Sequence, residues 1–342
     1  MVTNTVAADK VDEVGPFFSV VIPTRDRAEL LSRALASVEA QRFRDVEVLV
    51  VDDGSKPACA NACGALVKAC RIPAEYLHLG SYRRGRGPAY VRNVGAWRAR
   101  GQYLAFLDDD DEWSDAAYLE KAHAALRAGA ADILFANQVA IEASSGESKP
   151  LWLHRLAERM RQAGKVQREG CYALTVANLA AFSGFCHLNT TVVRRDLFNS
   201  IGGFDEFLLY EEDLEFYLRA VDSAQGILLL PDTVSRHYTA SGEARDSVSQ
   251  GLRRIERLIS RRQLLSKSLL KLHSAALKRQ CRKRLSHVNR DLARLMVDRG
   301  DSGLAFNFAA EAVVNGATLR WFLFTLLLAG RALSDALVGR RE

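Results

Sequence analysis

Residues 101–113 read GQYLAFLDDDDEW, in which an apolar run of strand-forming residues ends in four consecutive aspartates at positions 108–111. A second stretch has the same design, because residues 46–55, VEVLVVDDGS, end an apolar run in Asp52 and Asp53. Short apolar runs bounded by polar turn residues are typical of buried strands. Two acidic clusters that follow two buried strands indicate a ligand site at one edge of a sheet.

The segments around these two strands alternate between strand and helix patterns. Strands are predicted at residues 17–23, 46–51, 75–79, 103–107 and 132–141, and helices at residues 27–41, 57–70, 88–100 and 115–128. Alternation of this kind predicts crossover connections and therefore an α/β fold, with a mainly parallel sheet flanked by helices. Ligands bind such sheets at the carboxyl ends of the strands, where both acidic clusters are expected.

The second half of the chain is less regular. We expect a polar loop at residues 144–149, an amphipathic helix at 151–163, strands at 186–194 and 226–230, and a helix at 213–220. From residue 247 the pattern is helical, in three segments at about residues 252–299, 302–314 and 318–338. The chain is thus predicted to comprise a flexible arm (1–16), an α/β domain (17–246) and a basic α-helical C-terminal region (247–342).

The composition is that of a globular protein, with 48% hydrophobic and 26% charged residues among 342. The net charge of +6 is unevenly distributed, because residues 251–300 hold 15 Lys and Arg against 3 Asp and Glu. The N-terminus lacks the apolar stretch of a secretory signal. The longest apolar run, residues 321–330, is about half of the ~20 residues that cross a bilayer. We therefore expect a cytoplasmic protein without a transmembrane helix.

The four aspartates require a counter-charge, because adjacent carboxylates repel one another. Oxygen ligands alone suit Mg²⁺ or Mn²⁺ rather than zinc. Since Mg²⁺ commonly binds one or two carboxylates together with substrate phosphates, the cluster predicts a metal-bound diphosphate. The alternative is a solvated helix N-terminus, in which the acids favour the helix dipole and Asp115 caps the helix.

Other polar residues fit a nucleotide ligand. Asp52 would accept hydrogen bonds from a nucleobase or a ribose, although Asp-Gly is also common turn chemistry. Arginine forks match phosphate oxygens, and four arginines lie in or just before the helix predicted at 88–100, namely Arg83, Arg84, Arg86 and Arg92. Arg92 is the strongest candidate among them, and the alternative for the group is a solvated loop.

Together these motifs resemble those of the family 2 glycosyltransferases, which have the Rossmann-like GT-A fold of nucleotide-diphospho-sugar transferases. The resemblance covers about residues 17–238 and implies that residues 17–246 are a GT-A catalytic domain. It rests on the order of six motifs, namely VVIPTRDR (20–27), VVDDGS (50–55), AYVRNVG (89–95), GQYLAFLDDDDEW (101–113), IGGFDE (201–206) and EEDLEFYLR (211–219).

On the donor side, the resemblance implies a UDP-sugar held with Mn²⁺ or Mg²⁺. The implied residues are Pro23, Thr24 and Asp52 in the nucleoside pocket, Arg92 near the nucleotide, and Asp108, Asp109 and Asp110 as the D-x-D motif, with Asp110 facing the metal. His237 stands where some members place a histidine near the metal or the diphosphate, although a single histidine is more often structural. Arg25 departs from the aromatic residue that many relatives carry next to the base.

On the acceptor side, Glu212 and Asp213 resemble the family's ED motif, with Asp213 as the base that takes a proton from an acceptor hydroxyl. Either carboxylate could instead cap a helix. The family is inverting, and a glycan or lipid-linked acceptor is expected, as in cell-surface polysaccharide or glycolipid synthesis. The alternatives are a non-catalytic sugar-nucleotide binder or scaffold, and a nucleotidyltransferase, whose usual Gly-rich, Lys-bearing opening is absent here.

The basic C-terminal region has two interpretations. A basic amphipathic helix, with the apolar residues 321–328, suits the anionic inner face of the cell membrane. Alternatively, the charges form the outer face of packed helices. Nucleic-acid binding is not expected, because no recognised nucleic-acid module accompanies the basic residues.

Overall fold

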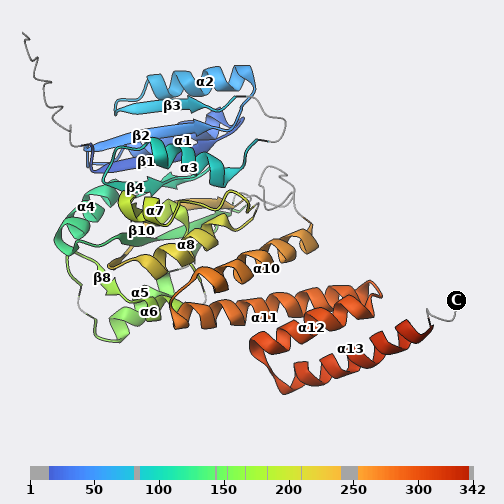
Figure 1. Cartoon of the computed structure of the whole chain (residues 1–342). Coiled ribbons are helices and arrows are strands. Elements are labelled where there is room, and N and C mark those ends of the chain that lie inside the picture. Colours follow the sequence, from blue (N-terminus) through green and yellow to red (C-terminus); the bar gives the residue numbers. More distant parts are fainter. Residues whose placement is uncertain are drawn as a thin grey trace, which may run out of the picture.

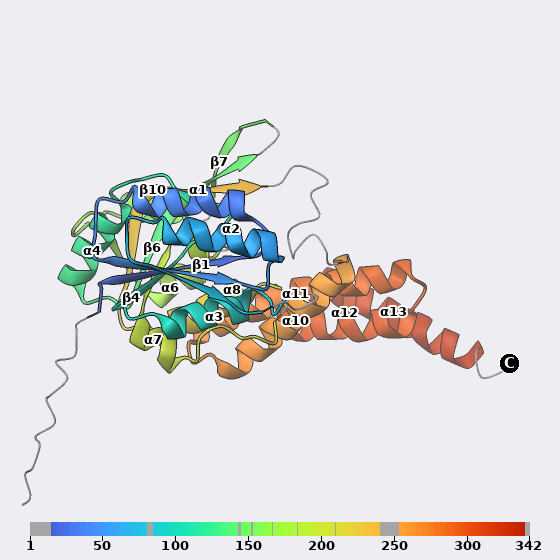
Figure 2. The ribbon, with the colours of Figure 1, turned by 90° about the horizontal axis from the view of Figure 1, so that it is seen from above.

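The computed structural model describes residues 15–80, 85–142, 145–151, 153–165, 167–182, 184–208, 210–239 and 253–338. Most of the predicted arm, Arg83 and Arg84, and the predicted boundary between residues 246 and 247 lie outside these ranges. A ten-stranded sheet forms the centre, with helices on both faces, and the C-terminal helices extend to one side (Figure 1, Figure 2).

The first half of the chain builds the parallel part of the sheet, in the spatial order β3-β2-β1-β4. These strands are β1 (Phe18–Thr24), β2 (Val46–Asp52), β3 (Ala74–His78) and β4 (Tyr103–Phe106). Parallel neighbours need crossover connections, which here are α1 (Ala28–Glu39), α2 (Pro57–Lys68) and α3 (Pro88–Arg98). The alternation predicted from the sequence is confirmed, and each bound agrees to within a few residues.

The second half completes the sheet. β9 (Thr191–Arg194) runs antiparallel between β4 and β6 (Ile133–Glu142), and β10 (Ile227–Thr239) lies parallel to β6. Strands β1, β2, β3, β4, β6 and β10 thus share one direction, which confirms a mainly parallel α/β sheet. Short antiparallel strands lie at the margins, namely β5 (Glu112–Trp113) and β8 (Tyr172–Leu174) on β10, and β7 (Ser148–Leu151) on β6.

Three local predictions are wrong in their bounds. Residues 148 and 149, expected in a loop, begin β7, which pairs with β6. The strand expected at 186–194 is confined to β9, because residues 188–190 form a 3₁₀ turn, η1 (Leu188–Thr190). The strand expected at 226–230 continues to Thr239, since β10 resumes its pairing with β6 after register shifts between Leu229 and Ser235.

The first C-terminal segment, predicted as one helix at 252–299, consists of α10 (Arg254–Lys271) and α11 (Ala275–Asp298). The break has a polar cause. The Asp222 carboxylate accepts hydrogen bonds from the backbone N–H groups of His273 (2.6 Å) and Ser274 (2.8 Å), and the Ser274 hydroxyl caps α11. Side-chain oxygens that bind N–H groups in this way start a new helix.

The remaining helices cover the faces of the sheet or extend the C-terminal region. They are α4 (Tyr118–Gly129), α5 (His154–Gln162), α6 (Val176–Ala180), α7 (Arg195–Ser200), α8 (Glu212–Ser223), α12 (Ser302–Gly316) and α13 (Leu319–Val338). Among the described residues, none of the helices combines the length and apolar character that crossing a membrane requires.

Two large hydrophobic clusters lie on opposite faces of the sheet. Helices α1, α2 and α4 contribute to one, and α3, α8, α10 and α11 contribute to the other. Leu264 and Leu265 of α10 are fully buried in the same cluster as Phe106 and Phe216. Each such leucine contributes about 1.5–3 kcal/mol, so the first two C-terminal helices are firmly anchored on the α/β core.

Close packing fixes α3 on the sheet. A Cβ atom at Gly95 would lie 2.5 Å from Cγ1 of Val21 in β1, so only glycine lets the helix approach this closely. Arg92 lies one turn earlier on the same helix, and its Cα position is therefore set by the packing of α3 against β1 and β2.

Candidate active site

Arg92 connects the aspartates that follow β4 with the acidic start of α8. Its Nη2 donates to Asp108 Oδ1 and its Nη1 to Glu212 Oε1, each over 2.7 Å. The Arg92 side chain is only 8% exposed, so it does not belong to a solvated loop. Burial disfavours the charge of Arg92, but Asp108 and Glu212 outweigh burial and raise its pKa.

The same contact determines the charge of Asp108. Burial opposes ionisation of this carboxyl group, but Arg92 and, after it, His187 outweigh burial and lower the pKa of Asp108 to about 2. The Asp108 backbone N–H also donates to Asn189 Oδ1 (2.9 Å). Asp108 is therefore ionised near neutral pH, with its carboxylate held by Arg92 and its backbone held by Asn189.

Asp109 and Asp110 face the loop that follows β1. The Thr24 hydroxyl donates to Asp109 Oδ2 (2.7 Å), and Arg27 Nη1 donates to both Asp109 Oδ1 and Asp110 Oδ2 (3.1 Å each). Burial, followed by the charges of Asp108 and Asp111, raises the pKa of Asp110 to about 7, although Arg27 lowers it. One arginine thus serves two carboxylates, and a further cation would relieve the repulsion.

Asp111 is fully buried and holds His237. Its Oδ2 lies 2.8 Å from His237 Nδ1, its Oδ1 accepts the Tyr238 backbone N–H (2.8 Å), and Asn189 Nδ2 donates to its Oδ2. Burial lowers the pKa of His237, but the Asp111 carboxylate outweighs burial and raises it. A carboxylate that orients a histidine ring is a recurrent feature of metal sites.

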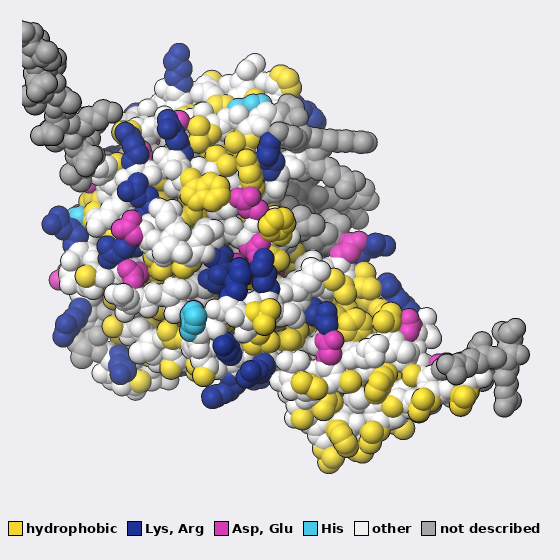
Figure 3. Space-filling model, viewed as in Figure 1, with side chains coloured by type: hydrophobic (Ala, Val, Ile, Leu, Met, Phe, Trp, Pro, Cys, Tyr) yellow, Lys and Arg dark blue, Asp and Glu magenta, His cyan; other side chains and the backbone are white. Residues whose placement is uncertain are grey.

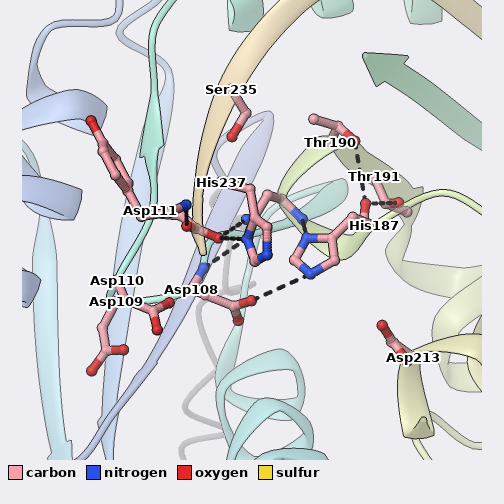
Figure 4. A network of polar contacts seen from close by, with 12 residues as sticks. Asp108, Asp109, Asp110, Asp111, His187, Thr190, Thr191, Asp213, Ser235 and His237 are labelled. Atoms are coloured by element: carbon pink, nitrogen blue, oxygen red, sulfur yellow. Dashed lines mark hydrogen bonds and ion pairs between the residues drawn. The ribbon is translucent and has the colours of Figure 1, made fainter. Parts of the chain in front are cut away.

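A second histidine, His187, lies on the same side of the aspartates. Its Nε2 is 3.8 Å from Asp108 Oδ2, and its ring centroid is 5.0 Å from that of His237. Potential ligand atoms lie within 4.8 Å of one another in two groups, Asp108 with Asp110 and Asp111, and Asp111 with the two histidines. Figure 4 shows both histidines beside the aspartates, while Asp213 approaches the region from α8.

Asp52 and Asp53 shape the end of β2. Asp52 is fully buried, and its carboxylate accepts the Ser55 backbone N–H (2.7 Å) and the Tyr76 hydroxyl (2.5 Å). Asp53 accepts the backbone N–H groups of Arg86 (2.7 Å) and Gly87 (3.0 Å), which lie just before α3. These contacts tie the segment before α3 to the ends of β1 and β2, where the half-buried Pro23 also lies.

Glu212 and Asp213 lie side by side but differ in surroundings. Glu212 is bound by Arg92, whereas Asp213 Oδ1 accepts the Leu214 backbone N–H (2.7 Å). Asp213 also borders an apolar pocket that includes Phe135, Phe216 and Tyr217. Burial and then the charge of Glu212 raise the pKa of Asp213 to about 7, against the influence of Arg92.

The structure therefore unites most of the predicted site residues. The four aspartates at residues 108–111, here called the aspartate loop, include the predicted Asp108, Asp109 and Asp110. Thr24 and Arg92 bind this loop directly, Glu212 joins it through Arg92, and His237 joins it through Asp111. Asp213 is adjacent to Glu212. Asp52 and Pro23 lie at the neighbouring strand ends.

Sequence reasoning missed Arg27, His187 and Asn189. Arg27 begins the helix predicted after the first strand and ends the motif at residues 20–27, so its position offered a signal. His187 and Asn189 precede β9, and only the insertion of this antiparallel strand beside β4 brings them to the aspartates.

Comparison with known proteins agrees with this geometry. The profile described as Glycosyl transferase family 2 matches residues 19–202, more than half of the chain. The succinoglycan biosynthesis protein ExoO of Rhizobium meliloti (strain 1021) is 42% identical over 108 residues, 32% of this chain and 28% of that protein. The GalNAc(5)-diNAcBac-PP-undecaprenol beta-1,3-glucosyltransferase of Campylobacter jejuni is 38% identical over 98 residues, 28% of this chain and 30% of that protein. The matches thus span under a third of these relatives.

Solved structures share the fold. S. aureus TarS 1-349 in complex with UDP-GlcNAc gives a TM-score of 0.66 at 20% identity and covers 93% of this chain and 88% of that one. The mannosyltransferase PcManGT from Pyrobaculum calidifontis, in complex with GDP-Man and Mn²⁺, gives a TM-score of 0.53 at 17% identity and covers 94% of this chain and 81% of that one. The chain belongs to family 2 of the glycosyltransferases and has the GT-A fold, which confirms the resemblance seen in the sequence.

Removal of one charge from the aspartate loop should stabilise the metal-free protein. The pKa of Asp110 is raised from 3.8 to about 7, so the folded state gains a proton that the unfolded state lacks, and stability falls as the pH rises through this range. With EDTA at pH 8 we expect Asp110→Asn to be about 1 kcal/mol more stable than wild type in urea unfolding, a value reduced for solvent screening.

This advantage should shrink as the pH is lowered to 5, where Asp110 of the wild type is protonated. Asp335→Asn, which removes an exposed aspartate from α13, controls for loss of one surface charge. Equal or lower stability of Asp110→Asn at pH 8 would show that the loop is not under electrostatic repulsion.

Proposed function

We propose that the protein transfers a sugar from a nucleotide-diphosphate donor, with a UDP-sugar as the expected donor, to a hydroxyl group of a glycan or lipid-linked acceptor. The transfer would be a single in-line displacement with inversion at the anomeric carbon. The observation that carries the proposal is the Asp108–Arg92–Glu212 bridge, because it holds a cation-binding loop beside a carboxylate suited to accept a proton. The Campylobacter relative is named for a PP-undecaprenol-linked acceptor, which supports this acceptor class.

The donor would bind over the aspartate loop. Asp108, Asp110 and His237 would hold Mn²⁺ or Mg²⁺, and Asp111 would orient His237 from behind. Carboxylates with an imidazole suit Mn²⁺, while carboxylates alone also suit Mg²⁺. When bound, the ion stabilises the negative charge of the departing diphosphate. The Mn²⁺ complex of PcManGT supports a divalent ion in this fold.

The nucleoside would lie at the ends of β1 and β2, near Pro23, Thr24 and Asp52. Each carboxylate oxygen has two lone pairs, so Asp52 retains acceptor capacity for a base or ribose beside its bonds to Ser55 and Tyr76. Arg92 would be the counter-ion that holds the Asp108 carboxylate in place for the donor. The UDP-GlcNAc complex of TarS supports UDP as the first nucleotide to test.

Asp213 would take the proton of the acceptor hydroxyl. Glu212 suits this role less well, because Arg92 occupies its carboxylate. A general base works best when its pKa lies near the working pH, and burial beside apolar side chains brings the pKa of Asp213 to about 7. Glu212 is then part of the support that holds the first turn of α8.

Donor binding tests the first half of this proposal. Calorimetry should detect UDP binding that strengthens with Mn²⁺ in the wild type, and Asp110→Asn should lose the Mn²⁺-dependent part, about tenfold or more in affinity. Asp335→Asn should bind like the wild type. If UDP does not bind with or without Mn²⁺, GDP, dTDP and CMP donors come next, and failure of all four contradicts a nucleotide-sugar donor.

Turnover tests the second half. We expect Asp213→Asn to lower kcat by about 10²–10⁴-fold while UDP affinity stays unchanged. Because only the ionised carboxylate accepts a proton, wild-type turnover should fall as the pH drops below about 7, the raised pKa of Asp213. Near wild-type turnover in a folded Asp213→Asn variant would exclude this base, and UDP binding without any transfer would favour the scaffold alternative.

We also propose that the C-terminal helices bind an anionic membrane surface. The outer side of α13 exposes Leu319, Phe322, Leu323, Leu326 and Leu327, each by half or more, and Figure 3 shows hydrophobic side chains across these helices. Soluble monomers rarely expose so large an apolar patch. The exposed Arg294 of α11 lies with its guanidinium 5.3 Å from the ring centroid of Trp321 at the start of α13, and exposed arginine near apolar side chains favours anionic lipid.

Vesicle co-sedimentation tests this surface. Vesicles with phosphatidylglycerol should bind the wild type, and Leu323→Glu with Leu327→Glu should weaken binding about tenfold or more, because two leucines that would enter the lipid are replaced by charged residues. Trp97→Gln changes an exposed aromatic residue of α3 and serves as the control. Binding that is unaffected by the double substitution, or equally reduced by the control, would contradict membrane docking through α13.

A further inference from the structure

Helix α10 lies along α8, the helix that carries Glu212 and Asp213 (Figure 1). Polar contacts join α10, or the residues that follow it, to both ends of α8. Arg261 of α10 binds Glu211 at the start of α8, and the residues after α10 bind Asp222 near its end. Between these points Leu264 and Leu265 are buried in the core that α8 shares. Both helices lie outside the matched family region, residues 19–202, and α10 packs against the helix that carries Glu212 and Asp213.

The contact at the start of α8 is a two-point ion pair. Arg261 Nε donates to Glu211 Oε2 over 2.7 Å, and Arg261 Nη2 donates to Glu211 Oε1. The Glu211 side chain is only 13% exposed, and the Arg261 guanidinium also lies 5.9 Å from the Tyr210 ring centroid. A bidentate arginine–carboxylate pair fixes orientation as well as distance.

Glu211 needs this support because its backbone is unusual. It adopts the left-handed conformation, with φ of 60° and ψ of 33°, at the position that precedes the first turn of α8. Residues with a Cβ atom avoid this region, and such conformations persist only where the surroundings impose them, often at functional sites. The direction in which Glu212 and Asp213 leave the loop depends on this one residue.

We infer that Arg261 is a positioning residue for the transfer reaction, which holds Glu211 in its left-handed conformation so that Glu212 meets Arg92 and Asp213 faces the acceptor. The inference rests on the proposed function, since it assigns Asp213 the role of base. Arg261 acts through Glu211 and touches no reacting atom. The C-terminal region would then supply part of the active site in addition to any contact with lipid.

The next residue of α10 provides a matched control. Arg262 also forms a bidentate ion pair, but with Glu311 of α12, over 2.7 and 2.8 Å, away from α8. Arg261→Ala and Arg262→Ala each remove one arginine from adjacent positions of one helix and leave one carboxylate without its arginine partner. General loss of stability would affect both variants, whereas a positioning role predicts a defect for Arg261→Ala alone.

The first test compares kcat and KM of the two variants. We expect Arg261→Ala to lower kcat by about 10–100-fold, the usual effect of a misplaced catalytic group, with UDP affinity unchanged. Arg261→Lys should recover part of this loss, and Arg262→Ala should behave like the wild type. Equal kcat losses in the two alanine variants, or a loss of UDP affinity in place of kcat, would overturn the inference.

The second test separates backbone conformation from charge. Glu211→Ala and Glu211→Gly both remove the carboxylate, but only glycine adopts positive φ without steric cost. We expect Glu211→Gly to keep several-fold more activity than Glu211→Ala, and Arg261→Ala to have little further effect in the glycine background. An equal or reversed order for the two substitutions would show that Arg261 does not act through this conformation.

The third test does not need turnover. Hydrogen–deuterium exchange of the peptide that holds residues 210–216 should be faster in Arg261→Ala than in the wild type or in Arg262→Ala. If the wild type transfers no sugar, the proposed function fails, yet this exchange still decides whether Arg261 orders the start of α8. Unchanged exchange in Arg261→Ala would overturn the inference even if the enzyme is active.

Discussion

The ion pairs of Arg92 with Asp108 and Glu212 are the interaction on which the site depends. The partly buried Asp108 and the buried Glu212 come from different elements there, and the guanidinium between them offsets the repulsion of their carboxylates. Burial of charge is costly unless geometry and hydrogen bonding are nearly ideal. Here the close approach of α3 to β1 at Gly95 provides that geometry, because it sets where the guanidinium lies.

The carboxylates around Arg92 are divided by their surroundings into different chemical roles. Arg92 lowers the pKa of Asp108, whereas burial raises the pKa of Asp110 and, against the influence of Arg92, that of Asp213 to about 7. Titratable groups whose environments push their pKa values apart mark the acid–base assignments of a site. Asp110 lies among other carboxylates, an environment that favours binding of a cation. Asp213 borders apolar side chains, an environment that favours binding of a proton.

Sequence patterns predicted what depends on local order. Strand and helix alternation gave the fold, and the acidic ends of β2 and β4 marked the edge that holds the site. They could not predict the role of Arg92, because its two partners lie 16 and 120 residues away in the chain. His187 and Asn189 were hidden for a similar reason, since β9 inserts antiparallel between β4 and β6, and no local pattern determines strand order.

The charge of the C-terminal region shows why composition alone misleads. Residues 251–300 hold 15 basic residues, but several form ion pairs with acidic residues of the same chain. Arg261 binds Glu211, Arg262 binds Glu311 and Lys267 binds Asp205. Each pair neutralises a basic charge of this region, which weakens its attraction for anionic lipid. The inner side of α10 therefore contacts the start of α8, and the proposed membrane contact would have to use the outward-facing charges and the exposed apolar side of α13.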